Sequence, residues 1–540
     1  MEFIEIPLSS SNKFIHECYS NDSGFFQYNV SFLSDCLKER VNDLKSRSFK
    51  REQLVEYLLN FNAKYEVSNK TTANIKKLLD DKSVVVVGGQ QAGLMTGPLY
   101  TIHKIITIIQ LAREQEVKLG VPVVPVFWIA GEDHDFQEIN HVYTYTDGAL
   151  KKNTVPHKPV KKQMVSSMEI DKQELNKWIM SFLETFGETP HTKSLLDELQ
   201  REASKSITYV DFFARLVQGL FSDEGLVLID SGDYEVRKLE SPFFTQLITQ
   251  IDDLQQALQY TQQNILNKGF SLTIGEQSNN AHLFYELKGE RVLLEWDEAS
   301  QLYRDKQNLC SFTRDELLEV AINNPELLSN NVVTRPLMQE FLFPVLAFVG
   351  GPGEIAYWAE LKQSFEVFDF KMPPIIPRHQ LTILTRAIET DMLETELDIK
   401  RILEHGVNEY EECMFDTPEN AAFQSELSNA RREIEAIHSR LREAALDVDR
   451  GLQQVVLKNS AFIQTQLDFL EKSVDKSIMR QHETVFLKLK RIEAFLKPNN
   501  AFQERSWNVY YFLNLYGRDF VKQLAQLPFS FEATHKIIKL

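Results

Sequence analysis

Cysteine, long apolar runs and targeting signals are scarce or missing in this chain. The cysteines form no C-x-x-C pair and lack the spacing of a zinc ribbon or a disulfide framework. No segment approaches the roughly 20 apolar residues of a membrane span, and residues 1–7 lack a basic region followed by an apolar core. We therefore expect a cytoplasmic location, no membrane partner and reduced thiols at Cys18, Cys36, Cys310 and Cys413.

Positive charge is also in deficit, with 59 Lys and Arg residues against 77 Asp and Glu residues and a formal net charge of −18. Such a charge repels phosphate backbones at long range, which argues against a nucleic-acid partner. The hydrophobic fraction of 43% and the charged fraction of 25% are typical of a soluble globular protein and not of a disordered one. A chain of 540 residues exceeds a single core and predicts several folding units of roughly 100–200 residues each.

The most informative stretch runs from an apolar segment, residues 84–87, through a glycine-rich turn to a helix that begins near Pro98. Unbroken β-branched residues predict a central parallel strand, and the free N–H groups of the helix start favour an anion. The turn fits neither the P-loop nor the dinucleotide-binding pattern. It predicts a ligand site or, alternatively, the tight strand-to-helix turn of any α/β domain. Its candidate ligand-binding residues are Gln90, Gln91, Gly93, Thr96, Gly97 and Tyr100.

A second apolar segment, residues 123–129, contains Trp128, a candidate substrate-binding residue, and ends just before four consecutive ionisable residues. Ligands of open α/β sheets bind at the carboxyl ends of such strands. Carboxylates and an imidazole can hold an ammonium group, bind a divalent cation or act as a base, so the catalytic candidates are Glu132, Asp133, His134 and Asp135. A helical continuation would place His134, Glu138 and His141 on one face, which allows a metal site. The alternative is that Asp135 and Glu138 cap a helix.

Further candidates lie at other predicted strand ends. Residues 345–350 form an apolar run that leads into a second glycine-rich turn and a helix, with Glu354 in the first helical turn, where it caps the helix or contacts a substrate amine. Arginines in such positions bind carboxylate or phosphate, or form surface ion pairs. Asp230 orients a ligand or caps a turn. The candidate substrate-binding residues of these segments are Asp230, Arg335, Gly351, Gly353, Glu354, Tyr357 and Arg378.

Strand-like and helix-like segments alternate up to about residue 380, which predicts an α/β fold with a parallel sheet. We expect strands at residues 84–87, 123–129, 225–230, 332–335 and 345–350. The predicted core comprises residues 1–150, 206–252 and 331–384, interrupted by insertions at 151–205 and 253–330. Residues 291–296 predict a short strand outside the main sheet.

Beyond residue 384 the strand signals cease, and residues 385–498 predict a helical coiled-coil domain. Apolar residues recur at steps of three and four over 423–448 and 463–496, with polar Gln481 interrupting the second series. These apolar faces need a partner, which is a helical hairpin, the α/β body or a second subunit. We expect a homodimer through the C-terminal helices. The aromatic segment 499–540 is predicted to pack back onto the body.

Four separated motifs carry a resemblance to a known family. They are residues 88–100, 131–136, 331–336 and 350–358, and with them this chain resembles the bacillithiol synthases over nearly its whole length. The resemblance implies ligation of L-cysteine to glucosaminyl malate, the last step in making a low-molecular-weight thiol. It also implies a Rossmann-like core with connecting-peptide insertions, a coiled coil and a homodimer.

A carboxylate is a poor electrophile, so this reaction implies activation by ATP or another nucleotide. Under the resemblance, the residues 132–135 bind the cysteine ammonium or deprotonate the sugar amine, and Arg335 and Arg378 hold the malate carboxylates. His103 and Lys104 are candidates for neutralising phosphate. The helix start lacks the H-x-G-H signature of adenylating synthetases, so an adenylate and an acyl phosphate both remain possible intermediates.

Two other functions are compatible with the sequence. A metal-dependent hydrolase would use His134, Glu138 and His141, and a non-catalytic scaffold would rely on the coiled coil. We expect the ligase and no metal. The ligase requires that residues 90–100, 132–135 and 350–354 converge on one cavity.

Overall fold

The computed structural model describes residues 1–540 except 9–13, 15–16, 18–23, 30–32, 160 and 276–278. Cys18 lies outside the described residues, whereas Cys36, Cys310 and Cys413 are free thiols. The chain divides into two units. The first comprises Met1–Tyr145, Lys151–Ile383 and Gln503–Ile538, and the second comprises Thr146–Leu150, Leu384–Phe502 and Lys539–Leu540.

The first unit is built around a sheet of five parallel strands in the order β13-β12-β2-β3-β6. Valine, isoleucine and phenylalanine side chains fill these strands, which are buried almost throughout, as expected when helices cover both faces of a parallel sheet. The predicted α/β class is therefore confirmed. The strands are β2 (Val84–Gln90), β3 (Val123–Ile129), β6 (Val227–Asp230), β12 (Val345–Gly350) and β13 (Ile375–Pro377).

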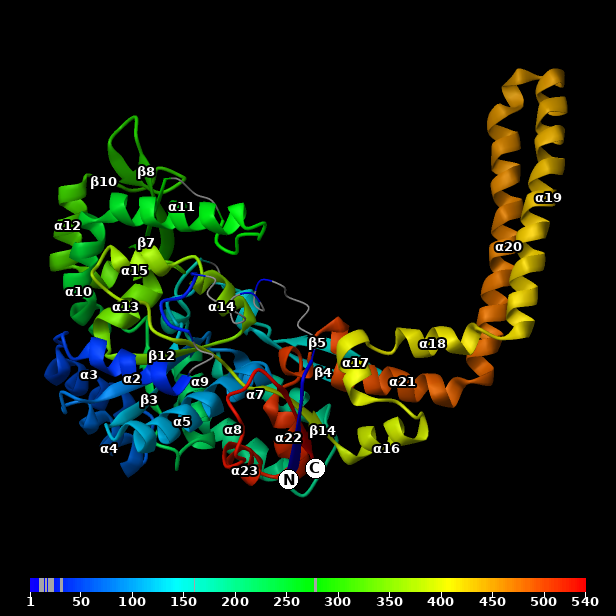
Figure 1. Ribbon diagram of the computed structural model, residues 1–540. Helices are drawn as coiled ribbons and strands as arrows, with labels where there is room; N and C mark the ends of the chain where they lie inside the picture. The colour runs from blue at the N-terminus through cyan, green and yellow to red at the C-terminus, as the bar shows by residue number, and fades with distance from the viewer. Residues whose placement is uncertain (9–13, 15–16, 18–23, 30–32, 160, 276–278) are drawn as a thin grey trace. The chain divides into compact units, whose positions relative to one another are not determined.

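Helix α5 (Leu99–Leu119) connects β2 to β3 and packs against both strands, so the predicted helix after Pro98 is confirmed. Three N-terminal helices, drawn in blue in Figure 1, contact the same sheet: α2 (Leu33–Leu44), α3 (Arg51–Ala63) and α4 (Asn69–Lys77). Shorter helices follow β3 and β12, namely α6 (Phe136–Ile139), α14 (Pro352–Trp358) and α15 (Lys362–Glu366).

The predicted strand at residues 332–335 is wrong, because helix α13 (Thr334–Leu342) begins there. The side-chain oxygen of Asn331 accepts the backbone N–H groups of Val333 at 2.8 Å and Thr334 at 3.1 Å. This turn satisfies donors that a strand would use, and proline is well tolerated in a first helical turn, where Pro336 lies. The strand prediction rested on the apolar β-branched residues and did not consider that the Asn331 side chain would bind these backbone N–H groups.

An antiparallel sheet of five strands lies outside the main sheet, in the order β10-β9-β8-β7-β11. Its strands are β7 (Asn280–Leu287), β8 (Glu290–Asp297), β9 (Leu302–Arg304), β10 (Ser311–Phe312) and β11 (Leu328–Asn330). The predicted separate strand at 291–296 is confirmed as β8. Helices of the same region are α10 (Tyr234–Thr249), α11 (Ile251–Asn267) and α12 (Arg314–Asn323).

A further region follows β3 and consists of a hairpin and three helices. These are β4 (His141–Thr146), β5 (Ala149–Thr154), α7 (Lys172–Glu184), α8 (Thr192–Lys205) and α9 (Tyr209–Leu220). The C-terminal segment returns to the first unit as α22 (Val509–Tyr516), α23 (Asp519–Ala525) and β15 (His535–Lys539). Strand β15 lies between β1 (Glu2–Ile6) and β14 (Gln380–Leu384).

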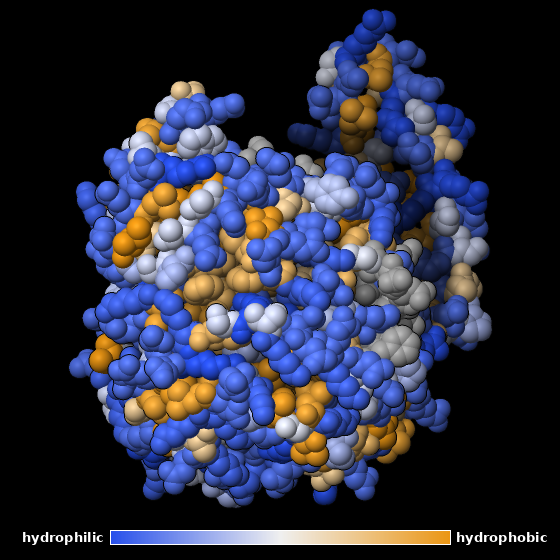
Figure 2. Space-filling view, turned by 60° about the vertical axis from the view of Figure 1, so that its left-hand side comes forward, coloured by the Kyte–Doolittle hydropathy of each residue, from blue (hydrophilic) through white to orange (hydrophobic). Residues whose placement is uncertain are grey.

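The second unit is helical, as predicted, and its longest helices α19 (Pro418–Val448) and α20 (Gln453–Gln481) form a hairpin. Arg431 binds Asp468 at 2.7 Å across the hairpin. Apolar side chains such as Phe462 and Phe469 nevertheless remain exposed, and Figure 2 shows orange atoms along this hairpin at the upper right. The other helices are α16 (Arg386–Glu394), α17 (Ile399–His405), α18 (Asn408–Phe415) and α21 (Glu483–Leu496). Across the described chain, no helix combines the length and apolarity that a membrane crossing requires.

Candidate functional site

A pocket of about 850 Å³ opens at the carboxyl ends of β2, β3 and β12 in the first unit. Gln90, Asp133 and Glu354 all line it, so the predicted convergence of three distant segments on one cavity is confirmed. Ligands of open parallel sheets bind at this edge. The predicted residues in the pocket wall are Gln90, Gln91, Gly93, Gly97, Tyr100, Trp128, Asp133, His134, Arg335, Gly351, Gly353, Glu354, Tyr357 and Arg378.

The turn between β2 and α5 depends on two glycines in close contact. A Cβ atom on Gly93 would lie 2.7 Å from the Cα atom of Gly97, and Gly97 itself has a φ of 73°. Thr96, between them, is completely buried and does not line the pocket, which corrects its assignment as a ligand contact. The side chain of Asn508 donates to the carbonyl of Gly97 at 2.8 Å and holds the turn from outside.

The start of α5 is less available to an anion than the sequence predicts. The N–H of Leu99 donates to the carbonyl of Trp507 at 2.8 Å. His103 and Lys104 are buried below the pocket wall, with the His103 ring 3.0 Å from Glu504. Neither side chain lines the pocket, so a ligand there would not touch them directly, and their role in neutralising phosphate stays a prediction.

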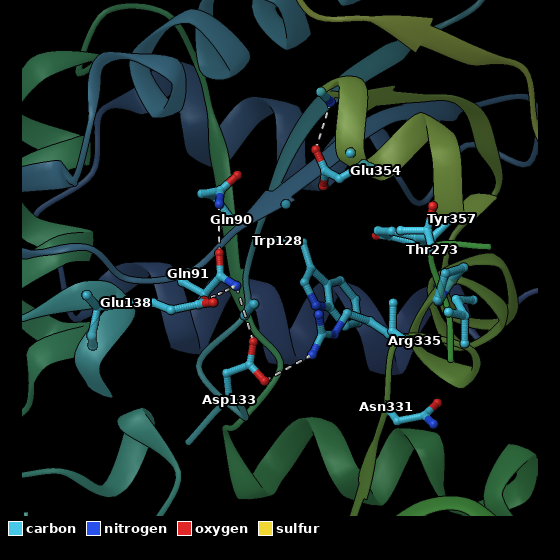
Figure 3. Close-up of a pocket in the computed structure, with 18 of the residues that line it drawn as sticks. Gln90, Gln91, Trp128, Asp133, Glu138, Thr273, Asn331, Arg335, Glu354 and Tyr357 are labelled. Atoms are coloured by element: carbon cyan, nitrogen blue, oxygen red, sulfur yellow. Dashed lines mark hydrogen bonds and ion pairs between the residues drawn. The ribbon is translucent and has the colours of Figure 1, made fainter. Parts of the chain in front are cut away.

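A chain of hydrogen bonds runs from Lys104 to two carboxylates. The Lys104 ammonium donates to Gln90 Oε1 at 3.0 Å, and Gln90 Nε2 donates to Gln91 Oε1 at 2.7 Å. Gln91 Nε2 then lies 3.4 Å from Asp133 and 3.2 Å from Glu138, as Figure 3 shows. Because the ammonium can only donate, it fixes the direction of both amides. Gln91 therefore presents its N–H groups to both carboxylates.

Glu132 is fully buried behind the wall, unlike its neighbour Asp133, and this corrects its assignment as a catalytic residue in contact with substrate. Its carboxylate binds Arg335 at 2.7 Å and Arg237 at 2.9 Å. Burial alone would raise the pKa of Glu132, but Arg335, Arg237 and Arg291 together lower it to about 2. Such a group is a poor proton acceptor, and its role is to hold Arg335 at the pocket.

Asp135 and Asp230 also lie outside the pocket wall. Asp135 caps α6, because its side chain accepts the N–H of Gln137 at 3.0 Å. Asp230 is buried and accepts from Ser166 Oγ at 2.9 Å, and burial raises its pKa to about 7. Their predicted contacts with a ligand are therefore corrected. Both carboxylates organise the turns around the site.

The metal-binding alternative fails on geometry. Helix α6 ends at Ile139 and β4 begins at His141, so His134, Glu138 and His141 do not share one helical face. Among the residues that the structure describes, no three His, Cys, Asp or Glu side chains are grouped so that they could hold a metal ion. The imidazole of His134 instead faces a guanidinium.

Arg291, on β8, is a pocket residue that the sequence did not reveal. Its NH1 group lies 3.3 Å from His134 Nδ1 and 3.6 Å from Asp133 Oδ1, and its guanidinium stacks 3.7 Å above the Phe284 ring. Burial and the charge of Arg291 lower the pKa of His134. The imidazole is therefore neutral near pH 7. Burial in turn lowers the pKa of Arg291 to about 10.

Arg378 and Glu354 are each fixed by a buried partner. Glu504 holds Arg378 through two hydrogen bonds of 2.5 and 2.6 Å, and the guanidinium lies 5.7 Å from the Tyr100 ring centre. Glu354 accepts the N–H of Gly351 at 2.8 Å and binds Lys104 at 2.5 Å, at the first turn of α14 as predicted. Glu354 is thus a cap that also reaches the pocket.

Several wall residues carried no local sequence signal, because they come from the antiparallel sheet, its connections and the C-terminal segment. His282 is the clearest example: Gln255 and Asn331 bind its two ring nitrogens, and burial lowers its pKa to about 4. The other polar wall residues that were not predicted site residues are Thr273, Asn280, Arg291, Asn331, Gln339 and Arg505, of which Asn331 lies in the motif at 331–336 and Gln339 on α13.

Comparisons with known proteins show the family of the chain. The family described as "Bacillithiol biosynthesis BshC, N-terminal Rossmann-like domain" matches residues 1–379, and "Bacillithiol biosynthesis BshC, C-terminal coiled-coil domain" matches residues 381–540. Proteins named "Putative cysteine ligase BshC" from Geobacillus sp. strain WCH70 and Geobacillus kaustophilus strain HTA426 are each 45% identical over 542 residues. The protein of that name from Bacillus licheniformis is 41% identical over 543 residues, and all three matches cover 100% of both chains. The Rossmann-like core and the coiled coil are thus confirmed, and the chain belongs to the BshC family of bacillithiol biosynthesis.

Proposed function

We propose that this protein is a ligase that joins the carboxyl group of L-cysteine to the glucosamine amine of glucosaminyl malate. Family membership and the name of the relatives support cysteine as a substrate. The observation that carries the proposal is a pocket at the carboxyl edge of the parallel sheet, lined by both carboxylates and guanidiniums. Such a pocket suits two substrates that each carry an amine and a carboxylate.

Amide formation requires that the cysteine carboxylate be activated first. A carboxylate oxygen attacks a nucleotide phosphorus and releases either pyrophosphate, leaving an acyl adenylate, or a nucleoside diphosphate, leaving an acyl phosphate. The sugar amine then attacks the carbonyl carbon, the C–N bond forms, and AMP or phosphate departs. The amine proton passes to a pocket carboxylate.

Asp133 is the carboxylate of the predicted cluster that best suits this role. It lies in the wall, accepts from Gln91, and faces Arg291 and Arg335 at 3.6 and 3.7 Å. Arg335 and Arg378 are suited to bind malate carboxylates, because guanidiniums keep donors free after pairing with one carboxylate. Their inner partners, Glu132 and Glu504, hold them in place.

The test is incubation of the purified protein with cysteine, glucosaminyl malate and ATP, followed by mass detection of the conjugate and of the nucleotide product. We expect the conjugate, with AMP indicating an adenylate and ADP an acyl phosphate. A parallel reaction without nucleotide tests whether activation depends on it. No conjugate with ATP or any other nucleoside triphosphate would overturn the proposal.

A further inference from the structure

Most charged side chains of the pocket wall are already neutralised within the chain. Arg335 pairs with Glu132, Arg378 with Glu504, Arg291 with Asp133, and Glu354 with Lys104. An ion pair within the wall needs no ligand charge for balance. A charged ligand is therefore attracted most strongly by wall residues that have no ion-pair partner within the protein.

Glu138 and Arg505 are those residues. Within the part of the chain that the structure describes, they are the charged wall residues other than histidine that have no ion pair. The Glu138 carboxylate accepts one hydrogen bond, from Gln91 at 3.2 Å. Arg505 is exposed at the end of the short helix Gln503–Arg505. Both charges are accessible to a ligand.

The two residues lie at the same end of the pocket. Glu138 also lines a small recess together with Ser506, the residue next to Arg505 in the chain, and Asn508. Both residues also affect the pKa of the Tyr100 hydroxyl, which burial raises. The charge of Arg505 lowers this pKa, and the charge of Glu138 raises it further. Both side chains therefore lie near Tyr100, at the same part of the pocket wall.

Negative charge is concentrated around Glu138. Burial, Asp135 and Asp133 all raise the pKa of its carboxyl, and no cation counters them. A substrate ammonium placed there would donate hydrogen bonds to the carboxylates of Glu138 and Asp133, both of which accept from Gln91 (Figure 3). The guanidinium of Arg505 is matched to a carboxylate.

We propose that Glu138 and Arg505 form a zwitterion subsite, in which Glu138 binds the ammonium group and Arg505 binds a carboxylate of the same substrate molecule. This rests on the proposed function, and two of its substrates have the required chemistry: cysteine and glucosaminyl malate. The subsite selects for a molecule that carries both charges. Compounds with either charge blocked bind it more weakly.

The test is titration calorimetry of the full chain, under a reducing agent, with cysteine and with glucosaminyl malate. Glu138→Gln and Arg505→Gln are each expected to weaken binding of one of these compounds by about tenfold or more, as for loss of one charge-assisted bond. The compound affected identifies the occupant of the subsite. The surface variants Glu235→Gln and Arg113→Gln, outside the pocket, serve as matched controls with unchanged affinity.

Blocked analogues separate the two ends of the subsite. If cysteine is the occupant, Glu138→Gln should no longer distinguish cysteine from N-acetylcysteine, and Arg505→Gln should no longer distinguish it from cysteine methyl ester. For glucosaminyl malate, the corresponding analogues lack the amine or the malate. Circular dichroism and the melting temperature establish that each variant is folded.

The result that overturns the subsite is wild-type affinity for both compounds in both folded variants. This outcome is distinct from failure of the proposed function, which is absence of conjugate from the wild-type protein. Charge-dependent binding that is lost in the variants would support the subsite even if no conjugate formed. Binding of neither compound to the wild-type protein would contradict the subsite.

Discussion

Glu132 and Asp133 are neighbours in the chain, but only Asp133 reaches the pocket. Glu132 is buried among Arg335, Arg237 and the N–H of Asn330, where its lowered pKa suits an ion-pair partner. Asp133 lies in the wall and accepts from Gln91. Burial and contacts with arginines thus make Glu132 a supporting residue, whereas Asp133 is the candidate reactive residue.

This separation predicts the effect of Glu132→Gln on stability. Removing one member of a buried ion-pair network leaves uncompensated arginines and should lower the free energy of unfolding by about 3–5 kcal/mol at pH 7. Because the pKa of Glu132 is lowered from 4.5 to about 2, its contribution is complete above pH 4.5 and lost as the pH falls toward 2. Denaturant unfolding at several pH values should show the difference from wild type shrinking below pH 4.5.

Exposed Glu235→Gln is the control for this experiment, with a change expected below about 0.5 kcal/mol. If Glu132→Gln unfolded like the wild-type protein yet formed no conjugate, Glu132 would be a reactive group and our assignment would be wrong.

At the scale of elements, the turn between β2 and α5 requires close contact of its glycines. We predict that Gly93→Ala destabilises the protein by about 1–3 kcal/mol, because the new methyl group would overlap the Gly97 backbone at 2.7 Å. Gly353→Ala is the matched control for stability, since no atom lies within 4 Å of a Cβ there. Equal melting temperatures for the two variants would contradict this account of the turn.

The hairpin of α19 and α20 covers only part of its apolar surface. Phe462 and Phe469 are 68% and 67% exposed, so these large apolar side chains of α20 are not covered by α19. We therefore expect a homodimer through these helices. Light scattering should give about twice the 62.6 kDa chain mass, and Phe462→Asp with Phe469→Asp should give the single-chain mass. A wild-type protein of single-chain mass at micromolar concentration would refute the dimer.

At the scale of the whole molecule, the C-terminal segment is part of the first unit and supports its pocket. Trp507 is 1% exposed and its carbonyl accepts the N–H of Leu99 at the start of α5. Trp507→Ala should lower the free energy of unfolding by about 3–5 kcal/mol. Thermal unfolding of the full chain tests this, with Tyr260→Ala, 61% exposed, as a control. A melting temperature equal to that of the control would indicate that the segment contributes little.

The sequence predicted those features of the fold and the pocket that depend on residues close together in the chain. Unbroken apolar runs identified β2, β3 and β12, and the polar residues after them identified the pocket edge, because strand direction alone places them there. The pairing of Arg378 with Glu504, 126 positions apart, has no local signal. Arg291 likewise reaches the pocket through a separate sheet, and only the fold reveals it.

Burial also decides which predicted residues can act. Lys104, His103 and Thr96 belong to the motif that best revealed the site, yet all three lie beneath its wall. A helix near a pocket presents only one side to it, and sequence spacing does not tell which side. The motif therefore predicted the pocket, but not which of its own residues line the wall.

The central claim is that the pocket at the carboxyl edge of the parallel sheet is where cysteine is joined to the sugar amine. The most direct measurement is kcat/KM for conjugate formation by Asp133→Asn, compared with Glu235→Gln. We predict a loss of about 100-fold or more for Asp133→Asn in a folded protein, as for removal of a general base, and none for Glu235→Gln. An unchanged kcat/KM in Asp133→Asn would contradict the claim.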